Sequence, residues 1–389
     1  PEPPFTTSSL QQDAARKLGF TSGRTMMIAQ QLYEGIVLGR QGATGLITYM
    51  RTDSTRISNL AVDEARGYIS AEYGKEYIPM RPNIYAMGKK AQDAHEGIRP
   101  TSILRTPADV EHYLNRDQLR LYTLIWQRFA ASQMSAAVYD TISAQIAAGD
   151  YQLRAHGSKF RGYTAVYVGA EISKKEKDTL LPELAAGDSL ALSELNPEQH
   201  FTEPPPRYND ASIVKTLEEM GIGRPSTYAP IIETIQKRGY VERREKQFHP
   251  TELGFIVTDM LEEYFKHIVD VKFTANLEGE LDEVADGSLD KNDLLRNFYD
   301  PFEETLKKAE SIIGEVDIPD EVTDIPCDKC GRMMLVKQGR FGKFLACPGF
   351  PDCRNAKPLL RDTGVSCPKC GGKIVERKSR RGRSFFGCD

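Results

Sequence analysis

The sequence predicts a multidomain α+β protein, and three observations carry this prediction. The chain has 389 residues, which at roughly 150 residues per domain is enough for two or three domains. Helical periodicity dominates residues 10–136, whereas residues 139–200 alternate in the manner of short strands. All 7 cysteines lie between positions 327 and 388, which indicates a separate small module there.

The overall composition excludes a membrane-spanning protein. Apolar residues make up 40% and charged residues 27% of the chain, and no apolar run approaches the roughly 18 residues that a bilayer span requires. The first residues, PEPPFTTSSL, form neither a basic nor an apolar signal region, so we expect no secretory signal and a cytoplasmic location. Because this start is rich in proline and lacks an initiator methionine, we also expect a piece of a longer protein.

The first domain is expected over residues 1–136 and is mainly helical. Residues 10–136 have the pattern of helices for most of their length. One short apolar strand, Gly45–Met50, interrupts the helices. The expected helices are Ser9–Leu18, Thr25–Leu38, Asn59–Tyr73 and Pro107–Ala137.

A β-rich domain is expected over residues 137–206. Its clearest strand-like segments are Tyr163–Val168 and Asp188–Leu192, which are bounded by glycine and proline. The proline-rich stretch Phe201–Tyr208 predicts a connector to the next domain.

Residues 207–320 predict a helical domain of winged-helix type. The amphipathic helix Asp210–Met220 is broken by Gly221–Pro225, and we expect Ser226 to cap a second helix. Val241–Phe248 then alternates like a short hairpin. A helix, a tight turn, a second helix and a wing commonly bind DNA, although the same outline also serves as an ordinary packing unit.

Two cysteine sets predict zinc ribbons at residues 325–362 and 365–389, of which the second is truncated. Two close cysteine pairs on two turns are the ligand set of a structural zinc site. The second set has three cysteines, which is explained if a fourth ligand follows position 389. Free thiols or a redox pair are the alternative interpretation. The candidate ligands are Cys327, Cys330, Cys347 and Cys353 in the first set, and Cys367, Cys370 and Cys388 in the second.

The charge of the chain is distributed unevenly. From position 327 onward, 15 Lys and Arg face 5 Asp and Glu, whereas the preceding residues carry 36 and 50. In both cysteine modules cations alternate with aromatic residues, as in Lys337–Phe344 and Lys378–Phe386. Cations that follow phosphates and rings that stack on bases suit single-stranded nucleic acid. A solubilising tail, with its rings in the core of the ribbon, is the alternative.

The segment Gly45–Ser58 contains the candidate reactive group. An apolar stretch ends at Tyr49, and cations and hydroxyls follow directly. A tyrosine phenol can attack phosphorus but is weak at its free pKa of about 10, so it needs a cation that holds the phosphate. Arg51 lies two residues further on, and on a strand both side chains project from one face. A tyrosine at the end of a strand is more often simply an edge of the core.

Four stretches resemble motifs of bacterial DNA topoisomerase I, the type IA family, in the same order. Gly45–Ser54, GLITYMRTDS, resembles the active-site segment, and Gln92–Pro100 resembles the histidine motif. Ala211–Tyr240 and Phe273–Gly287 resemble two segments of the domain beside the active site. The resemblance covers essentially the whole chain. It implies a helical tyrosine-bearing domain, a β-rich strap or arch domain, a winged-helix-like helical domain and C-terminal zinc ribbons.

The resemblance assigns a reaction and roles by position. Tyr49 would attack a DNA phosphodiester and become joined to the 5′ phosphate, which frees a 3′ hydroxyl and keeps the bond energy without ATP. Strand passage and religation would then relax negatively supercoiled DNA. Arg51 would hold the scissile phosphate, and His95 would assist by hydrogen bonding. The implied DNA-binding residues are Arg51, Arg224, Ser226, Thr227, Arg238 and Gly239.

The resemblance also implies magnesium, but this chain has no Asp-x-Asp-x-Glu cluster that would hold the ion. The family places an acidic Toprim domain before the region that matches here, so we expect these residues to lack the metal half of the active site. A fragment that only binds single-stranded DNA is therefore the alternative function. A recombinase-like enzyme that forms a 3′ phosphotyrosine is a third possibility. We further expect a monomer associated with the nucleoid.

Overall fold

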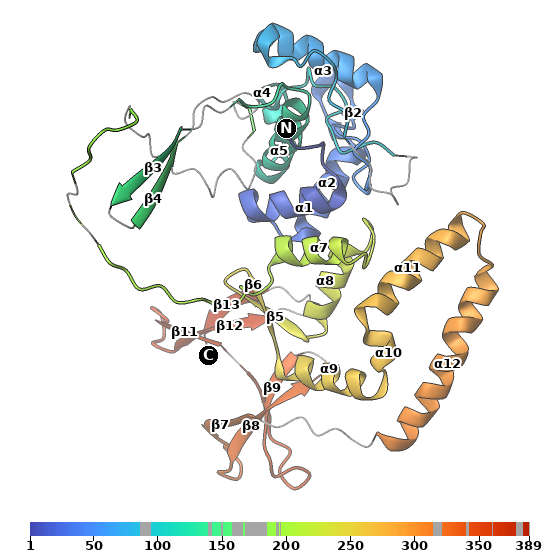
Figure 1. Cartoon of the computed structure of the whole chain (residues 1–389). Helices are drawn as coiled ribbons and strands as arrows, with labels where there is room; N and C mark the ends of the chain where they lie inside the picture. Colours follow the sequence, from blue (N-terminus) through green and yellow to red (C-terminus); the bar gives the residue numbers. More distant parts are fainter. Residues whose placement is uncertain are drawn as a thin grey trace. The chain divides into compact units, whose positions relative to one another are not determined.

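The computed structural model consists of two compact units, Pro1–Ala309 and Glu310–Asp389. It contains both helices and sheets, which confirms the α+β class (Figure 1). None of the helices that it describes is long and apolar enough to cross a membrane. The described residues are 1–85, 95–138, 142–148, 151–157, 166–167, 185–191, 194, 196–313, 321–339, 342–359, 361–378 and 384–388.

Capped helices form most of the first part of the N-terminal unit. The side chain that precedes each of these helices accepts a backbone N–H from the first turn, which satisfies a donor without a partner inside the helix. These helices are α1 (Thr7–Asp13), α2 (Ser22–Glu34), α3 (Asn59–Glu72), α4 (Pro107–Val110) and α5 (Arg116–Ser132). Shorter turns are the π-helix η1 (Ala14–Leu18) and the 3-10 turns η2 (Gly39–Gln41), η3 (Lys75–Tyr77) and η4 (Glu111–Tyr113).

Helix α5 lies at the centre of the main hydrophobic core. Leu121, Tyr122, Ile125 and Phe129 recur at helical spacing and are at most 1% exposed. They belong to one cluster with side chains of α1, α2 and the segment 46–50. Burial of a side chain of this size contributes about 1.5–3 kcal/mol, so the core fixes the segment that leads to Tyr49.

The structure corrects two predictions in this region. The sequence predicts one helix over Pro107–Ala137, but Asn115 caps α5 anew and separates it from α4 and η4. The predicted strand Gly45–Met50 is wrong, because the regular pair is β1 (Ile36–Val37) with β2 (Ala43–Thr44). The apolar stretch after β2 is instead a largely buried, extended segment with one isolated bridge, Ile47 to Pro100, so its hydrophobicity reflects the core more than a regular strand.

The region expected to be β-rich contains one hairpin among its described residues, β3 (Ile142–Ala148) paired with β4 (Tyr151–Gly157). The predicted strand Tyr163–Val168 lies outside the described residues except for positions 166 and 167, which are not in a strand. The predicted strand Asp188–Leu192 is irregular and exposed over its described positions, 188–191. In the described part of the chain no strand pairs with positions 188–191, and a short alternating run without a partner does not become a strand.

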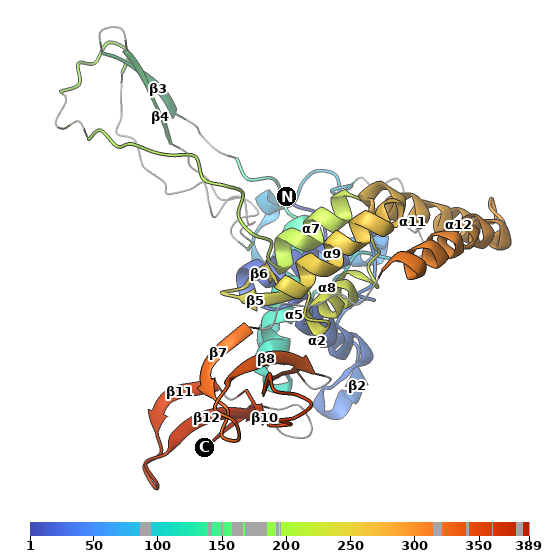
Figure 2. The ribbon, with the colours of Figure 1, turned by 90° about the horizontal axis from the view of Figure 1, so that it is seen from below.

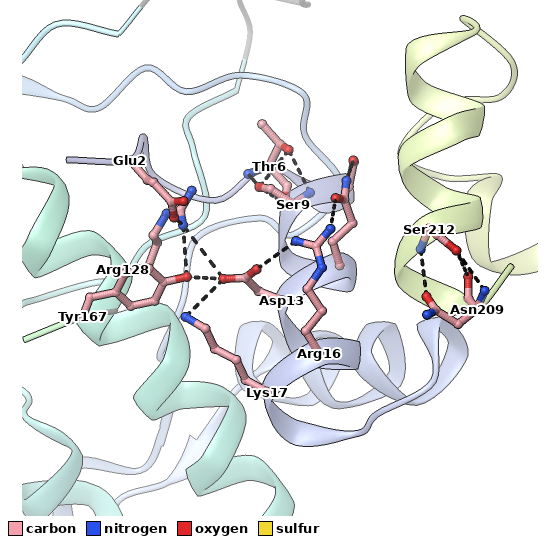
Figure 3. A network of polar contacts seen from close by, with 12 residues as sticks. Glu2, Thr6, Ser9, Asp13, Arg16, Lys17, Arg128, Tyr167, Asn209 and Ser212 are labelled. Atoms are coloured by element: carbon pink, nitrogen blue, oxygen red, sulfur yellow. Dashed lines mark hydrogen bonds and ion pairs between the residues drawn. The ribbon is translucent and has the colours of Figure 1, made fainter. Parts of the chain in front are cut away.

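Tyr167 joins the N-terminal helices through a buried polar network (Figure 3). Its hydroxyl donates a hydrogen bond to Asp13 and accepts one from Arg128 Nη1 at 3.0 Å. Arg128 also pairs with Glu2, and Lys17 Nζ lies 3.4 Å from Asp13 and 3.5 Å from the centre of the Tyr167 ring. Buried charges are tolerated when they are paired, so the network ties Tyr167 to α1, η1 and α5.

A helix, a turn, a second helix and a hairpin follow the connector. The elements are α7 (Asp210–Glu219), α8 (Tyr228–Lys237), β5 (Val241–Arg244), β6 (Gln247–Pro250) and α9 (Glu252–Tyr264). Ser226 does not cap α8 as predicted. The N-cap position belongs to Thr227, whose Oγ1 accepts the N–H of Arg224 instead.

Helix α7 packs directly against α1 (Figure 1). The backbone N–H of Ser22 donates to Asp210 Oδ1 at 3.1 Å, and Ser8 Oγ donates to Glu218. Asp210 is 4% exposed and also pairs with Arg243 of β5. These contacts attach the helix–turn–helix to the helices that surround Tyr49.

The helices α10 (Lys266–Val269), α11 (Val271–Ala285) and α12 (Lys291–Ile312) complete the helical part. Helices α11 and α12 run side by side in both views (Figures 1 and 2). Phenylalanine rings pack between them, with centroids 6.1 Å apart for Phe273 and Phe298 and 5.8 Å apart for Phe298 and Phe302.

The C-terminal unit contains two antiparallel sheets, visible as orange and red strands in Figure 2. The first has the order β10–β9–β8–β7 and the second the order β11–β12–β13. Their strands are β7 (Glu321–Pro326), β8 (Met333–Gly339), β9 (Gly342–Ala346), β10 (Ala356–Pro358), β11 (Arg361–Ser366), β12 (Lys373–Lys378) and β13 (Ser384–Cys388). The two cysteine modules of the sequence therefore correspond to two small antiparallel sheets.

Candidate active site and zinc ribbons

Tyr49 lies in an extended segment that pairs with the segment following His95. The N–H of Thr48 donates to the Arg99 carbonyl at 2.9 Å, and Thr48 Oγ1 donates to the Gly97 carbonyl at 2.8 Å. The pairing continues where Thr101 N–H donates to the Leu46 carbonyl at 2.9 Å. It brings the tyrosine segment and the histidine segment together although they are far apart in the sequence.

Thr7, the first residue of α1, holds the other side of the tyrosine segment. Its Oγ1 donates to the Met50 carbonyl at 2.7 Å and accepts the N–H of Thr52 at 2.8 Å. Its own N–H donates to the Thr52 carbonyl at 2.8 Å. Thr7 is fully buried, so these hydrogen bonds are made away from water, where a lost partner is costly.

A cavity of about 310 Å³ opens beside Tyr49. Its lining residues come from the segment that contains Tyr49, the segment that contains His95, the turn before α8, and α11. The lining residues are Tyr49, Arg51, Thr52, Asp53, His95, Arg224, Pro225, Ser226 and Asp282. Five of the residues that the sequence singles out therefore meet in one place.

Two rings flank the Tyr49 phenol. Tyr33, at the end of α2, packs edge to face with Tyr49 at a centroid distance of 5.4 Å and an angle of 65°. The His95 ring lies on Tyr49 at 5.1 Å and 45°. Aromatic pairs of this kind contribute about 0.5–1.5 kcal/mol beyond their burial, so they restrict the orientation of the Tyr49 ring.

The two arginines of the cavity differ in their partners. Arg51 is exposed and forms no hydrogen bond or ion pair with any residue in the described part of the chain. Arg224 Nη2 donates to Asp282 Oδ2 at 2.7 Å and to the Glu278 carbonyl at 3.0 Å. Burial lowers the pKa of Arg224, but the hydrogen bond and charge of Asp282 and the charge of Glu278 outweigh burial and raise it.

The remaining predicted DNA-binding residues lie near the cavity or away from it. Thr227 is next to the lining residue Ser226 but is not part of the lining. Arg238 and Gly239 lie at the far end of α8, where Arg238 is exposed and Gly239 adopts φ 74°. The structure therefore places Arg224 and Ser226 with Tyr49, and Arg238 and Gly239 apart from it.

The cysteines gather as two sets of ligands in the C-terminal unit. Within each set all Sγ atoms lie within 4.8 Å of one another, and none of the seven cysteines forms a disulfide. Zinc–sulfur bonds of about 2.3 Å in a tetrahedron put sulfurs about 3.8 Å apart. The distances of 3.7 Å from Cys327 to Cys353 and 3.3 Å from Cys330 to Cys347 fit this geometry. The second set consists of Cys367, Cys370 and Cys388.

Hydrogen bonds to sulfur support a thiolate in the first set. Desolvation raises the pKa of Cys327, but the hydrogen bond from Asn355 and those from backbone N–H groups outweigh it and lower the pKa to about 6. Asn355 Nδ2 lies 3.2 Å from this sulfur. A thiolate is the form of cysteine that binds a metal. Backbone hydrogen bonds lower the pKa of Cys347 and that of Cys353, but desolvation and the neighbouring sulfurs outweigh them and raise it. It is therefore the gathering of four sulfurs, and not a lowered pKa at each of them, that suits the set to zinc.

Two family comparisons agree with this arrangement. The sequence profile of the DNA topoisomerase family matches residues 1–296, and that of the topoisomerase DNA-binding C4 zinc finger matches residues 324–362 and 364–389. The chain belongs to the bacterial type IA DNA topoisomerase family. Its cysteine sets are accordingly the zinc ribbons of a topoisomerase, and the predicted family is confirmed.

A solved topoisomerase has the same fold. The chain is similar to full-length topoisomerase I from Thermotoga maritima, with 36% sequence identity and a TM-score of 0.70. The similarity covers 99% of this chain and 60% of that chain. This topoisomerase chain thus spans about 60% of the length of the relative.

Two carboxylates that line the topoisomerase cavity, and one ring that packs against Tyr49 outside the lining, escaped the sequence analysis. Asp53 follows Arg51 by two positions, and the carboxylate of Asp282 lies on α11 within an acidic run whose partner is not visible in the sequence. Tyr33 belongs to another helix. The alternation of Arg51 and Asp53 was a usable local signal, whereas only the fold shows that Asp282 and Tyr33 reach the site.

Proposed function

We propose that Tyr49 is the nucleophile of a type IA topoisomerase. Its oxygen attacks a DNA phosphodiester, forms a bond to the 5′ phosphate and displaces the 3′ oxygen, which leaves with a proton as a hydroxyl. Religation reverses these steps, so the number of phosphodiester-type bonds stays constant and ATP is not required. The observation that carries this proposal is the meeting of Tyr49, Arg51 and His95 in one cavity.

The charges of the cavity suit a phosphate. Arg51 holds the scissile phosphate and neutralises the charge that develops on it, since its guanidinium is exposed and unpaired within the described part of the structure. His95, whose ring packs against that of Tyr49 and lines the same cavity, assists by hydrogen bonding to the bound phosphate or the leaving hydroxyl. Arg224, Ser226 and Thr227 bind the neighbouring DNA backbone, with Arg238 and Gly239 as further contacts.

The zinc ribbons bind single-stranded DNA in this proposal. The region from position 327 onward has 15 Lys and Arg against 5 Asp and Glu, and Phe385 and Phe386 of β13 are 48% and 69% exposed. Exposed rings and cations together suit bases and phosphates. The whole enzyme is then a monomer on the nucleoid that relaxes negatively supercoiled DNA by cleavage, strand passage and religation.

The described residues do not provide a site for magnesium. Their only groups of three or more close potential ligands are the two cysteine sets. Asp53 and Asp282 both line the cavity, but Asp282 is paired with Arg224. We therefore assign the magnesium ligands of the full enzyme to an acidic domain outside these residues and derive no step through the ion.

A covalent adduct tests the nucleophile. Labelled single strands are incubated with the chain, supplied with the acidic domain of the family and magnesium, and the products are denatured. We expect a 5′-linked adduct that Tyr49→Phe abolishes and Tyr33→Phe retains. An adduct that persists in Tyr49→Phe excludes the assignment, and linkage through a 3′ phosphate indicates recombinase chemistry instead.

The second candidate function is binding of single-stranded DNA without autonomous catalysis. The lack of a carboxylate cluster among the described residues favours it for these 389 residues on their own. We expect them to bind single strands but to leave supercoiled plasmid unrelaxed until the acidic domain is added. Relaxation by the 389 residues alone would show that they contain a complete active site.

A further inference from the structure

Arg224 is held by two acidic side chains of α11. Its Nη2 donates to Asp282 Oδ2 at 2.7 Å, and its Nη1 lies 3.5 Å from Glu278 Oε2. Nη2 also donates to the carbonyl of Glu278 at 3.0 Å. Since Glu278 and Asp282 are four residues apart, they lie on the same face of the helix. The guanidinium is thus bound on one side by two carboxylates and a backbone carbonyl oxygen.

These ion pairs are only partly shielded from water. The side chains of Arg224, Glu278 and Asp282 are 29%, 21% and 38% exposed. A pair in this range is stronger than a fully exposed one, yet it avoids the large desolvation penalty of a buried one. A ligand with a comparable negative charge can therefore compete for Arg224.

The same guanidinium lines the cavity that contains Tyr49. Carboxylates and phosphates bind the planar fork of arginine in similar geometries, and the cavity is the proposed place of a DNA phosphate. Arg51 lines it too but has no such partner in the described part of the chain. Arg51 is therefore available to bind a phosphate, whereas Arg224 is already paired with Asp282 and Glu278.

We propose that Glu278 and Asp282 are positioning residues that occupy Arg224 in place of a DNA phosphate and release it when a strand enters. This inference rests on the proposed binding of DNA in the cavity. The acidic pair keeps the guanidinium directed at the cavity without DNA, and it lowers the affinity for DNA because binding must first break the pair. The exchange makes entry of a strand reversible, as an enzyme that must release its product requires.

Binding of a short single-stranded oligonucleotide to the full chain, measured by fluorescence anisotropy in chelator-free buffer without magnesium, tests the proposal. The variants are Asp282→Asn and Glu278→Gln, each of which removes one charge from the pair. Glu280→Gln is the matched control, because it removes the same charge from the same helix at an exposed side chain with no partner among the described residues. Each change is also made together with Arg224→Ala.

We expect Asp282→Asn to bind about fivefold more tightly than Glu280→Gln, the size of a partly exposed ion pair, with a similar gain in Glu278→Gln. In the Arg224→Ala background the gain in DNA affinity should vanish. This comparison assigns the gain to the ion pair, and it subtracts the contribution of the ribbons, which is the same in both backgrounds. Equal affinities of Asp282→Asn, Glu278→Gln and Glu280→Gln, or a gain that survives Arg224→Ala, overturn the proposal. Weaker DNA binding by Asp282→Asn also overturns the proposal, because it would show that the carboxylates are needed for the contact between Arg224 and DNA.

The outcomes separate this inference from the proposed function. If wild-type protein binds the oligonucleotide and Arg224→Ala weakens binding, the cavity binds DNA, and the variants of the acidic pair alone decide the inference. If Arg224→Ala has no effect, DNA does not contact Arg224 and the wider proposal for the cavity fails. Thermal melting of each variant confirms that it is folded before affinities are compared.

Discussion

Arg51 and Arg224 line one cavity and differ in what surrounds them. Arg51 lies two residues after Tyr49 in a segment fixed on both sides by hydrogen bonds, so its position relative to the tyrosine is set locally. Arg224 comes from the turn before α8 and depends on α11 for its orientation. A phosphate in the cavity would therefore contact Arg51, which lies on the same segment as the nucleophile, and Arg224, which lies on a different element.

Arg51→Ala should lower adduct formation on the order of 100-fold, because loss of one preorganised cationic or hydrogen-bonding group around a transferring centre typically costs about 3 kcal/mol. The measurement is the rate of 5′-linked adduct formation in the presence of the acidic domain. Arg40→Ala, which removes an exposed cation of η2, should keep the wild-type rate. A rate for Arg51→Ala equal to that of this control would remove Arg51 from the reaction.

Tyr228 should make the protein sensitive to alkali. Desolvation raises its pKa to about 12, above the value of about 10 for an exposed tyrosine. The unfolded chain thus loses this proton first as pH rises, so the stabilising contribution is complete below about pH 10 and declines between about pH 10 and 12. Tyr228→Phe should show a smaller loss of stability across this interval in denaturant titrations. Tyr299→Phe, at a 54% exposed tyrosine, is the control and should follow the wild type.

What the sequence predicted at this scale depended on local order. Tyr49 and Arg51 stand two positions apart, and the cysteines of the pairs Cys327–Cys330 and Cys367–Cys370 stand three apart, so spacing alone brought them together. Asp282 reaches the cavity, and Tyr33 reaches the Tyr49 ring, only because helices from distant parts of the sequence pack there. No spacing rule encodes that packing.

At the scale of elements, α1 also positions the segment that contains Tyr49. A capping box between Thr6 and Ser9 fixes the start of the helix (Figure 3). The start in turn places Thr7 where it accepts from and donates to the tyrosine segment. The first turn of α1 therefore acts as a support for the backbone just after Tyr49.

Thr7→Val should destabilise the N-terminal unit by about 1–3 kcal/mol, since it keeps the shape of the side chain but leaves buried backbone groups of Met50 and Thr52 without a partner. Chemical denaturation measures this loss. Thr305→Val removes an exposed hydroxyl that donates within α12 and should stay within about 0.5 kcal/mol of wild type. Equal stabilities of the two variants would mean that water replaces the support from Thr7.

The elements also show where prediction from sequence stops. Asp210–Met220 and Val241–Phe248 were placed nearly correctly, because an amphipathic helix and a hairpin carry their periodicity within themselves. Gly45–Met50 has the apolar character of a strand, yet Ile47 makes one isolated bridge to Pro100. Whether an apolar segment becomes a strand depends on the backbone that lies beside it, which the segment does not reveal.

At the scale of the whole molecule, the chain divides into a unit stabilised by an apolar core and a unit that depends on metal ligands. The helices of the first unit surround one extended cluster of buried side chains. In the second unit the buried cluster is small and includes Cys327 and Cys347 themselves. The two units should therefore respond differently to a chelator.

Purified protein should contain about one tightly bound zinc per chain, held by the four-cysteine set, and a more weakly bound second zinc. Three thiolates leave one position for water, and affinity falls with ligand number. Metal analysis after gel filtration measures both, with Cys347→Ser expected to remove the tight zinc and Cys388→Ser only the weak one. A chelator should abolish the sheets of the C-terminal unit while thermal unfolding of the N-terminal unit stays unchanged. Absence of zinc in protein prepared without chelator would contradict the ribbons.

The cavity is assembled from the tyrosine and histidine segments, the turn before α8 and α11, and this order along the chain has a consequence in time. Synthesis adds roughly 5–20 residues per second, so Asp282 leaves the ribosome on the order of tens of seconds after Tyr49. During that interval a nascent chain contains Tyr49, Arg51 and His95 but lacks the side of the cavity that is lined by Arg224 and by α11. The cavity beside the tyrosine is therefore complete only after these later residues have been synthesised.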